Sequence, residues 1–257
     1  MHVIRGYYRL TLAAFLLIFW GTLVVITSWF PFSVRNIALP GWMTYFAAKT
    51  LAWALGFKVH CDQQETIKQH EGFLFANHVS FMDIIVLVTV TPLRFVAKIE
   101  TLKVPIIGQA AKGIKCVFVD RSNKASRHAA RDQIAAAEKF PAIAIYPEGT
   151  RGSGKELLPF RHGAFELAQH GQVPILPVAI KYDPPTAVSW GNEGLVAGGW
   201  RLASQYQRVY VTLTPLPVVT PTPNDDPTQL ANQMRDDIGA IVYPAITSPN
   251  PEKSEKL

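Results

Sequence analysis

The stretch GFLFANHVSFMD, residues 72–83, joins a short apolar run to a histidine and a carboxylate. The run 72–76 has the composition of a buried strand, and Phe81 opens a segment suited to a helix. Open α/β sheets place their chemistry at such strand-to-helix junctions. Asp83, five positions after His78, is able to accept a hydrogen bond from one imidazole nitrogen, which leaves the other as a base. The stretch therefore predicts an α/β fold with a His–Asp general base at one edge of its sheet.

The same residues have a structural interpretation that stays open beside the catalytic one. The segment from Ser80 to Asp83 is similar to a helix capping box, with Ser80 at the N-cap and Asp83 at the third helical position. The two interpretations are compatible, because a carboxylate at a helix start can face back toward His78. Ser80 is also a candidate nucleophile, but it does not lie in a G-x-S-x-G elbow, so direct base catalysis is favoured.

A second motif, YPEGTR at residues 146–151, follows another apolar run and places proline and glycine where a tight turn requires them. In a parallel sheet this turn lies at the same edge as His78. Arg151 presents a planar fork suited to a phosphate, and Arg121, which closes a third apolar run, offers a second one. The alternatives are a solvated surface turn for the first arginine and a surface salt bridge for the second.

One stretch of the sequence matches a phosphate-binding P-loop only in part. Residues 149–155, GTRGSGK, match the start of a phosphate-binding P-loop. Glu156 stands where a Mg²⁺-binding serine or threonine is required, and Pro159 obstructs the helix that would receive the phosphates. The sequence therefore disfavours a nucleotide-hydrolysing site.

The rest of the chain after residue 57 alternates short apolar runs with amphipathic segments. Strands are predicted at residues 73–77, 94–97, 116–119, 142–146, 175–180 and 209–214. Helices are predicted at residues 81–90, 105–112, 124–139, 164–170 and 227–243. Gly, Pro and polar residues predict a long loop at 184–200 and a linker at 215–226. This alternation predicts a mostly parallel sheet flanked by helices.

Composition narrows the class of protein. The chain of 257 residues is 49% hydrophobic and carries a formal charge of +6. Apolar and basic together favour an anionic membrane surface, and no Lys/Arg run or RNA-binding motif supports nucleic acid as a partner. Two cysteines provide neither a disulfide framework nor a zinc set, so a reducing, cytosolic environment is expected and no metal is predicted.

The first 57 residues predict a pair of hydrophobic helices. Residues 10–30 contain no charge and would reach about 31 Å as a helix, enough to cross a bilayer. A second apolar stretch covers 41–57, and four of the six tryptophans lie in this part of the chain. A cleaved signal peptide or a buried core helix fits less well, whereas spanning and shallow insertion both remain open. We therefore predict a membrane anchor at 1–57, a catalytic domain at 58–247 and a disordered tail at 248–257.

Four segments in order resemble the blocks of one family. NHVSFMD (77–83), VFVDR (117–121), YPEGTR (146–151) and VPILPV (173–178) are similar to those of the 1-acylglycerol-3-phosphate acyltransferases of bacterial phospholipid synthesis. The resemblance covers residues 58–215, and LPFRHGAF at 158–165 is similar to the segment after the third block. This sequence departs where Lys115 and Cys116 replace a nearby glycine and where Tyr146 replaces a phenylalanine.

The resemblance implies a glycerolipid acyltransferase-like fold and a reaction. An acyl chain would pass from acyl-CoA or acyl carrier protein to the free sn-2 hydroxyl of 1-acyl-glycerol-3-phosphate, giving phosphatidic acid without a cofactor. The implied base is His78, oriented by Asp83. The implied acceptor-binding residues are Arg121, Glu148, Gly149, Thr150, Arg151 and, less directly, Lys98.

Other functions stay open at this point. A different lysolipid, such as lyso-ornithine lipid or a lysophospholipid, is an alternative acceptor, and a membrane-anchored P-loop protein is an alternative class. The expected place is the inner membrane, with the catalytic domain on its cytoplasmic face. The acyl-chain preference, the donor and the oligomeric state are not determined by the sequence.

Overall fold

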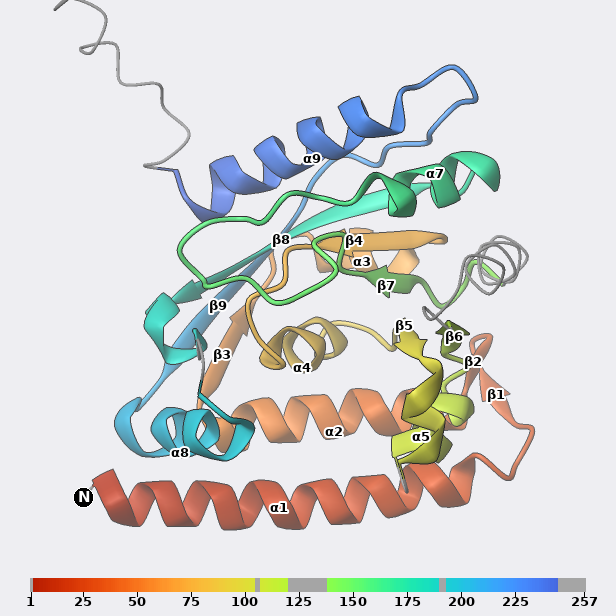
Figure 1. Ribbon diagram of the computed structural model, residues 1–257. Helices are drawn as coiled ribbons and strands as arrows, with labels where there is room; N and C mark the ends of the chain where they lie inside the picture. Colours follow the sequence, from red (N-terminus) through yellow and green to blue (C-terminus); the bar gives the residue numbers. More distant parts are fainter. Residues whose placement is uncertain (1, 105–106, 120–137, 190–192, 245–257) are drawn as a thin grey trace, which may run out of the picture.

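A central sheet of seven strands, in the order β3-β9-β8-β4-β7-β5-β6, organises the computed structural model (Figure 1). The structure describes residues 2–104, 107–119, 138–189 and 193–244. The strands are β3 Phe57–His60, β4 Phe73–Ala76, β5 Arg94–Lys98, β6 Val117–Val119, β7 Ile143–Ile145, β8 Ile175–Asp183 and β9 Val209–Pro215. Neighbouring strands are parallel except β8 and β9, which confirms the predicted mostly parallel sheet.

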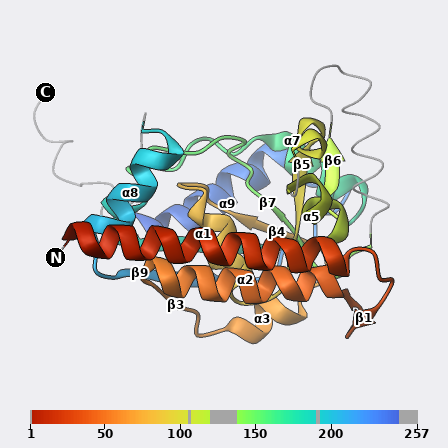
Figure 2. The ribbon, with the colours of Figure 1, turned by 90° about the horizontal axis from the view of Figure 1, so that it is seen from below.

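Helices cover both faces of this sheet (Figure 1). One face carries α7 and α9; the other carries α4 and then α2, with α1 outermost (Figures 1 and 2). The described helices are α1 His2–Thr27, α2 Leu39–Leu55, α3 Gln64–Gln69, α4 Met82–Val88, α5 Ile107–Gly113, α7 His162–His170, α8 Leu195–Gln205 and α9 Pro227–Val242, with short 3-10 turns η1 Ile99–Lys103 and η2 Pro185–Ala187.

The central strand β4 is buried on both faces, as its unbroken apolar sequence predicts. Phe73 and Phe75 pack into the core beneath α7 and α9. Leu74 and Ala76 pack into the opposite core beneath α2 and α4. Burying one such Phe or Leu side chain contributes about 1.5–3 kcal/mol, so β4 anchors both layers. The residues that follow β4 are therefore delivered to a rigid sheet edge.

Two regions differ from the sequence predictions. The predicted loop at 184–200 is wrong, because α8 begins within it at Leu195. Its glycines disfavour a helix by propensity, but the helix packs closely against α1, where a β-carbon at Gly6 would lie 2.8 Å from Ser204. The edge strand β3 and the short helix α3 escaped prediction because both carry mixed polar and apolar residues. The predicted helix at 124–139 and the tail at 248–257 lie, except for residues 138–139, outside the described residues.

The amino-terminal helices α1 and α2 run antiparallel, joined by a small hairpin of β1 Ser33–Val34 and β2 Ile37–Ala38 (Figure 2). By length and composition α1 is apolar enough to cross a membrane. The two arginines near the start of α1, Arg5 and Arg9, are hydrogen-bonded to a distant part of the chain. Arg5 donates to the carbonyl of Ser204 at 2.5 Å, and Arg9 donates to the carbonyls of Tyr206 and Gln207, each at 2.6 Å. The start of α1 is thereby fastened to the end of α8.

The second helix, α2, is part of the core. Leu51, Ala52 and Leu55 are buried in the same cluster as the α4 side of the sheet. Residues 1–57 remain our predicted membrane anchor, and α2 within them shares a core with the α4 side of the sheet.

Candidate active site

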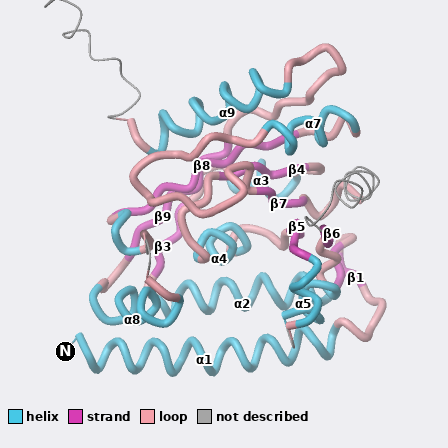
Figure 3. Tube along the Cα trace, in the orientation of Figure 1, coloured by secondary structure: helices cyan, strands magenta, loops and turns pink. Residues whose placement is uncertain are grey.

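The chain leaves β4 through a strongly held strand end. Asn77 extends the ladder to β8 with its side chain: it donates to the carbonyl of Ile180 at 3.0 Å and accepts from the Ile180 N–H at 2.7 Å. The next residue, His78, donates its backbone N–H to Glu148 Oε1 at 2.6 Å. A long loop between β7 and α7 passes this strand end, and Gly152 of that loop donates to the carbonyl of His78 at 2.7 Å (Figure 3). The β7–α7 loop therefore holds the backbone of His78 at both its N–H and its carbonyl, and Asn77 ties the preceding residue to β8.

His78 and Asp83 lie in direct contact. The imidazole Nδ1 is 2.8 Å from Asp83 Oδ2, and the same oxygen accepts the backbone N–H groups of Val79 at 2.7 Å and Ser80 at 2.8 Å. Asp83 is fully buried, whereas the His78 side chain is 15% exposed. A carboxylate that occupies Nδ1 leaves Nε2 as the free, basic nitrogen.

The capping arrangement differs from the prediction in its register. The helix α4 begins at Met82, and Phe81 rather than Ser80 occupies the N-cap. The Ser80 hydroxyl accepts the Met82 N–H at 3.3 Å while the Asp83 carboxylate reaches back to the Ser80 N–H. One carboxylate thus both stabilises the helix start and contacts the imidazole. Ser80 is 1% exposed, which disfavours it as a nucleophile.

Two tyrosines complete this cluster, and sequence reasoning missed their roles. The Tyr146 ring stacks on the His78 ring, with centroids 4.1 Å apart. The Tyr182 hydroxyl donates to Asp83 Oδ1 at 2.6 Å. Burial, and secondarily Asp83, raises the pKa of both tyrosines well above the ordinary value, so both stay protonated. Tyr182 lies 99 residues from Asp83, and no local pattern signals that contact.

Glu148 of the YPEGTR turn is buried, with 3% exposed. Its two carboxylate oxygens accept the backbone N–H groups of His78 at 2.6 Å and Leu158 at 3.0 Å. Burial raises the pKa of this carboxyl group, and the two N–H bonds oppose that shift. Glu148 therefore ties the loop to the end of β4.

The exposed part of the turn carries Arg151, and a second arginine, Arg161, lies beside it. The Arg151 guanidinium lies over the Phe81 ring at 4.0 Å, next to the helix start. Gly149 has φ +72°, and a β-carbon there would lie 2.6 Å from Arg161 Nε. Thr150 is exposed. Arg161 was not among the predicted site residues. The one sequence signal for it is that its segment, LPFRHGAF, directly follows the third block.

Two predicted site residues remain, Arg121 and Lys98. Arg121 lies outside the described residues. Lys98 is the last residue of β5, which is separated from β4 by β7 in the sheet. Within the described ranges, no three His, Cys, Asp or Glu side chains gather as a metal site.

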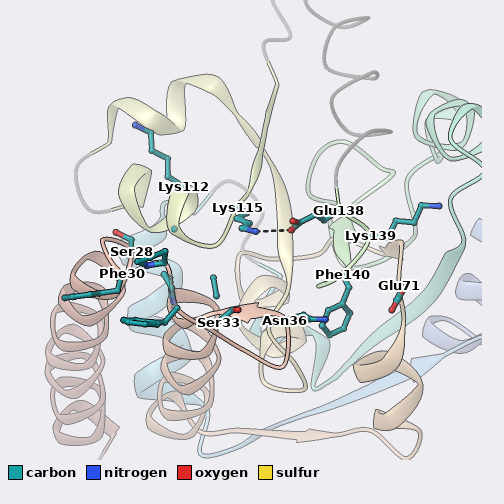
Figure 4. A pocket seen from close by; sticks show the side chains of 15 residues that line it. Ser28, Phe30, Ser33, Asn36, Glu71, Lys112, Lys115, Glu138, Lys139 and Phe140 are labelled. Atoms are coloured by element: carbon teal, nitrogen blue, oxygen red, sulfur yellow. Dashed lines mark hydrogen bonds and ion pairs between the residues drawn. The ribbon is translucent and has the colours of Figure 1, made fainter.

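Two of the cavities lie toward opposite ends of β4. A cavity of about 820 Å³ lies between the β1–β2 hairpin, α5 and the strand starts, where Glu71 precedes β4 (Figure 4). This is the end of the strand opposite His78. Another cavity, of about 550 Å³, is lined by Val79, Gly154, Tyr182 and Tyr243, and two of these residues, Val79 and Tyr182, donate hydrogen bonds to Asp83. The second cavity is the one suited by position to serve the site.

Tyr146 leads to a prediction about stability. Its hydroxyl is buried and, within the described part of the chain, has no hydrogen-bond partner. Such a group costs about 1–3 kcal/mol of desolvation. We expect Tyr146→Phe to raise the free energy of unfolding by about 1 kcal/mol, measured by denaturant unfolding in detergent. A loss of stability would mean that the hydroxyl has a partner, such as a bound water.

Known proteins place this fold in a class. Residues 58–181 match the family model described as acyltransferase. The fold is similar to the crystal structure of the 1-acyl-sn-glycerophosphate (LPA) acyltransferase PlsC from Thermotoga maritima, with a TM-score of 0.62. That match covers 97% of this chain and 99% of the other at 21% identity, so it shows the fold, including the amino-terminal helices. The family model and the fold together place this protein among the acyltransferases.

Sequence relatives narrow the class. The probable 1-acyl-sn-glycerol-3-phosphate acyltransferase of Mycoplasma genitalium is 33% identical over 204 residues, which cover 76% of this chain and 73% of the relative. The lysophospholipid acyltransferase LPCAT4 of Homo sapiens is 33% identical over 73% of this chain, but the match covers 37% of the human protein. The chain thus spans well under half the length of the vertebrate relatives that it matches. It belongs to the 1-acyl-sn-glycerol-3-phosphate acyltransferase family, as the four ordered blocks predicted.

Proposed function

We propose that this protein transfers an acyl chain from acyl-CoA or acyl carrier protein to the sn-2 hydroxyl of 1-acyl-glycerol-3-phosphate, giving phosphatidic acid. The observation that carries the proposal is the contact of 2.8 Å between His78 Nδ1 and a fully buried Asp83, at a sheet edge that also presents Arg151. Membership of the family supports the same reaction.

The proposed reaction uses His78 as a general base. His78 Nε2 takes the proton of the acceptor hydroxyl while the hydroxyl oxygen attacks the carbonyl carbon of the thioester. The C–S bond then breaks, and the thiolate leaves with the proton returned by the imidazolium. Asp83 holds the imidazole through Nδ1 and stabilises its positive charge between the two proton transfers. A thioester is already activated toward attack, so the reaction needs no metal or bound cofactor.

The acceptor phosphate is assigned to Arg151 of the turn and to Arg161 beside it. Both arginines are exposed, and the Arg161 side chain lies against Gly149 of the turn. A planar guanidinium binds a phosphate through two parallel hydrogen bonds, which a lysine ammonium does not reproduce. Arg121 remains a proposed third ligand on the basis of the second sequence block.

A lysolipid panel tests this function directly. Purified full-length protein in detergent is supplied with acyl-CoA or acyl carrier protein thioester, without ATP. The acceptors are lysophosphatidate, lysophosphatidylcholine, lysophosphatidylethanolamine and lyso-ornithine lipid. We expect the largest kcat/KM with lysophosphatidate. A larger value for another acceptor would reassign the substrate, and absence of transfer to every acceptor would overturn the proposal.

Arg151 leads to a kinetic prediction. We expect Arg151→Ala to raise KM for lysophosphatidate about tenfold or more, since a charge-assisted hydrogen bond contributes about 1.5–3 kcal/mol. KM for the acyl donor should change little. Arg151→Lys should recover only part of the loss, because the paired geometry is absent. If the donor KM rises instead, Arg151 belongs to the thioester side of the site.

We further propose that α1 attaches the protein to the inner membrane, with the catalytic edge on the cytoplasmic face. Large apolar side chains of α1 remain exposed at Val3, Ile4, Tyr7, Tyr8, Phe15, Leu17, Ile18, Phe19 and Ile26. Exposed apolar surface of this extent marks a membrane or protein contact. The product is a water-insoluble lipid, which favours the membrane. Access of protease to the catalytic domain only from the periplasm would contradict this orientation.

Charges on this surface provide the test. Phe15 and Ile18 are 62% and 70% exposed, so glutamates there disturb little packing. Each charge costs about 2.5–3.5 kcal/mol inside a bilayer. We expect the double Phe15→Glu, Ile18→Glu variant to leave the membrane fraction in flotation assays while its melting temperature in detergent is retained. Val218→Glu, on an exposed site outside α1, is the control and should stay bound. Unchanged flotation of the double variant would contradict attachment through α1.

A further inference from the structure

The strand β8 extends well beyond the end of β4. Their register pairs Ala76, the last residue of β4, with Val178, so residues 179–183 of β8 continue past the catalytic strand. Side chains alternate along a strand, and those of Val178, Ile180 and Tyr182 share the face that packs toward α4. The overhang therefore brings Tyr182 beneath Asp83, the buried carboxylate on α4.

The contact made there is specific. Tyr182 is 5% exposed, and its ring packs edge-on against Phe57 with centroids 6.4 Å apart, which restricts the hydroxyl to one position. That hydroxyl donates to Asp83 Oδ1 at 2.6 Å. A short bond to a buried carboxylate is of the strong, charge-assisted kind.

The two oxygens of Asp83 have separate partners. Oδ2 accepts from His78 Nδ1 and from two backbone N–H groups, whereas Oδ1 accepts from Tyr182 alone among the described residues. The pair of anchors sets the rotation of the carboxylate plane about its side-chain bond. Without the phenol, Oδ1 would be buried with no donor and the plane would be held from one side only.

We propose that Tyr182 is a positioning residue that acts through Asp83, fixing the plane of its carboxylate and moderating the charge that this carboxylate presents to His78. The inference rests on the proposed function, because it requires His78 to be the base. The phenol draws electron density from the carboxylate, so the imidazole faces less than a full negative charge. Buried networks of this kind hold their members in one arrangement.

Other titratable groups surround the pair. Tyr146 and Glu148 approach from the segment after β7, and Tyr243 approaches from the end of α9. Burial, and then Glu148, raises the pKa of Tyr243 to about 12, so it stays neutral. Glu148 is occupied by two backbone N–H groups. In the described part of the chain, none of these groups donates to Asp83 Oδ1.

The test is Tyr182→Phe in the full-length protein, assayed with lysophosphatidate and acyl-CoA across pH. Hydrogen-bond partners that orient metal-binding side chains contribute about 10–100-fold, and we expect an effect at the lower end of that range here, with kcat falling about tenfold. Loss of the phenol leaves more negative charge beside the imidazole and favours its protonated form. The acid limb of the kcat/KM profile should therefore move to higher pH. Tyr8→Phe, which removes an exposed phenol on α1 far from Asp83, is the matched control and should keep the parent profile.

A double-mutant cycle separates positioning from packing. Once Asp83 is replaced by Asn, removing the Tyr182 hydroxyl should change kcat by less than about twofold, because the two residues act as one unit. Equal effects in both backgrounds, or an unmoved acid limb, would overturn the proposal. If His78→Ala retains parent turnover, the base assignment itself fails. If His78→Ala is inactive while Tyr182→Phe has the parent profile, only the role of Tyr182 fails.

Discussion

Replacing His78 by alanine is expected to lower kcat by about 10³-fold or more, because positioned general bases contribute roughly 10²–10⁴-fold. The imidazole is the group held by Asp83, and its Nε2 is the nitrogen left to take the acceptor proton. KM for the two substrates should change little, since the substitution leaves the arginines of the turn in place. Initial rates with lysophosphatidate and acyl-CoA measure the effect.

Asp83→Asn is the companion variant. The amide cannot accept as a carboxylate does from three N–H groups, and it provides no negative charge for the imidazolium. We expect a severe loss that still leaves more activity than His78→Ala. A folded His78→Ala protein with near-parent turnover would falsify the base mechanism, and an acyl-enzyme trapped on Ser80 would replace it.

Glu148→Ala is expected to lower the free energy of unfolding by about 3 kcal/mol. The substitution leaves the N–H groups of His78 and Leu158 without their acceptors, at about 1–3 kcal/mol for each buried group. It also frees the loop that fixes the strand end, so kcat should fall together with stability. Denaturant unfolding in detergent and initial rates measure the two effects.

A control on the same loop isolates the buried contact. Glu156 is exposed, and Glu156→Ala should leave unfolding and turnover near the parent values. Equal unfolding free energies for the two alanine variants would show that the bonds of Glu148 to the backbone add nothing to stability. Glu148→Gln should be intermediate, because its amide oxygen accepts one N–H while its NH₂ meets the other donor.

The sequence predicted what depends on neighbours in the chain. His78 and Asp83 are five positions apart, and an unbroken apolar run before them is enough to place both at a strand end. The unbroken apolar β4 and the amphipathic α9 were predictable for the same reason. Contacts that depend on the register of distant strands were not: Tyr182 reaches Asp83 only because β8 overhangs β4.

Other misses have a similar cause. The glycines of α8 argue for a loop, and its helix depends on packing against α1, which no local pattern reports. The resemblance implied an acceptor-binding role for Glu148, which stays a prediction, but no local pattern signalled that this residue is buried. Its burial follows from the approach of two backbone donors that lie 70 and 10 residues away.

The fastening of Arg5 and Arg9 to the end of α8 has a practical consequence for handling this protein. A truncated protein that begins after residue 57 would lose the apolar helix α1. It would also lose Leu51 and Leu55 from the hydrophobic core. A soluble variant therefore requires polar substitutions at the exposed apolar positions of α1, while the side chains of α1 that pack on the rest of the protein are kept. A chimera with an unrelated membrane helix has the same requirement. The new helix would have to reproduce the surface of α1 that packs on α2 and α8.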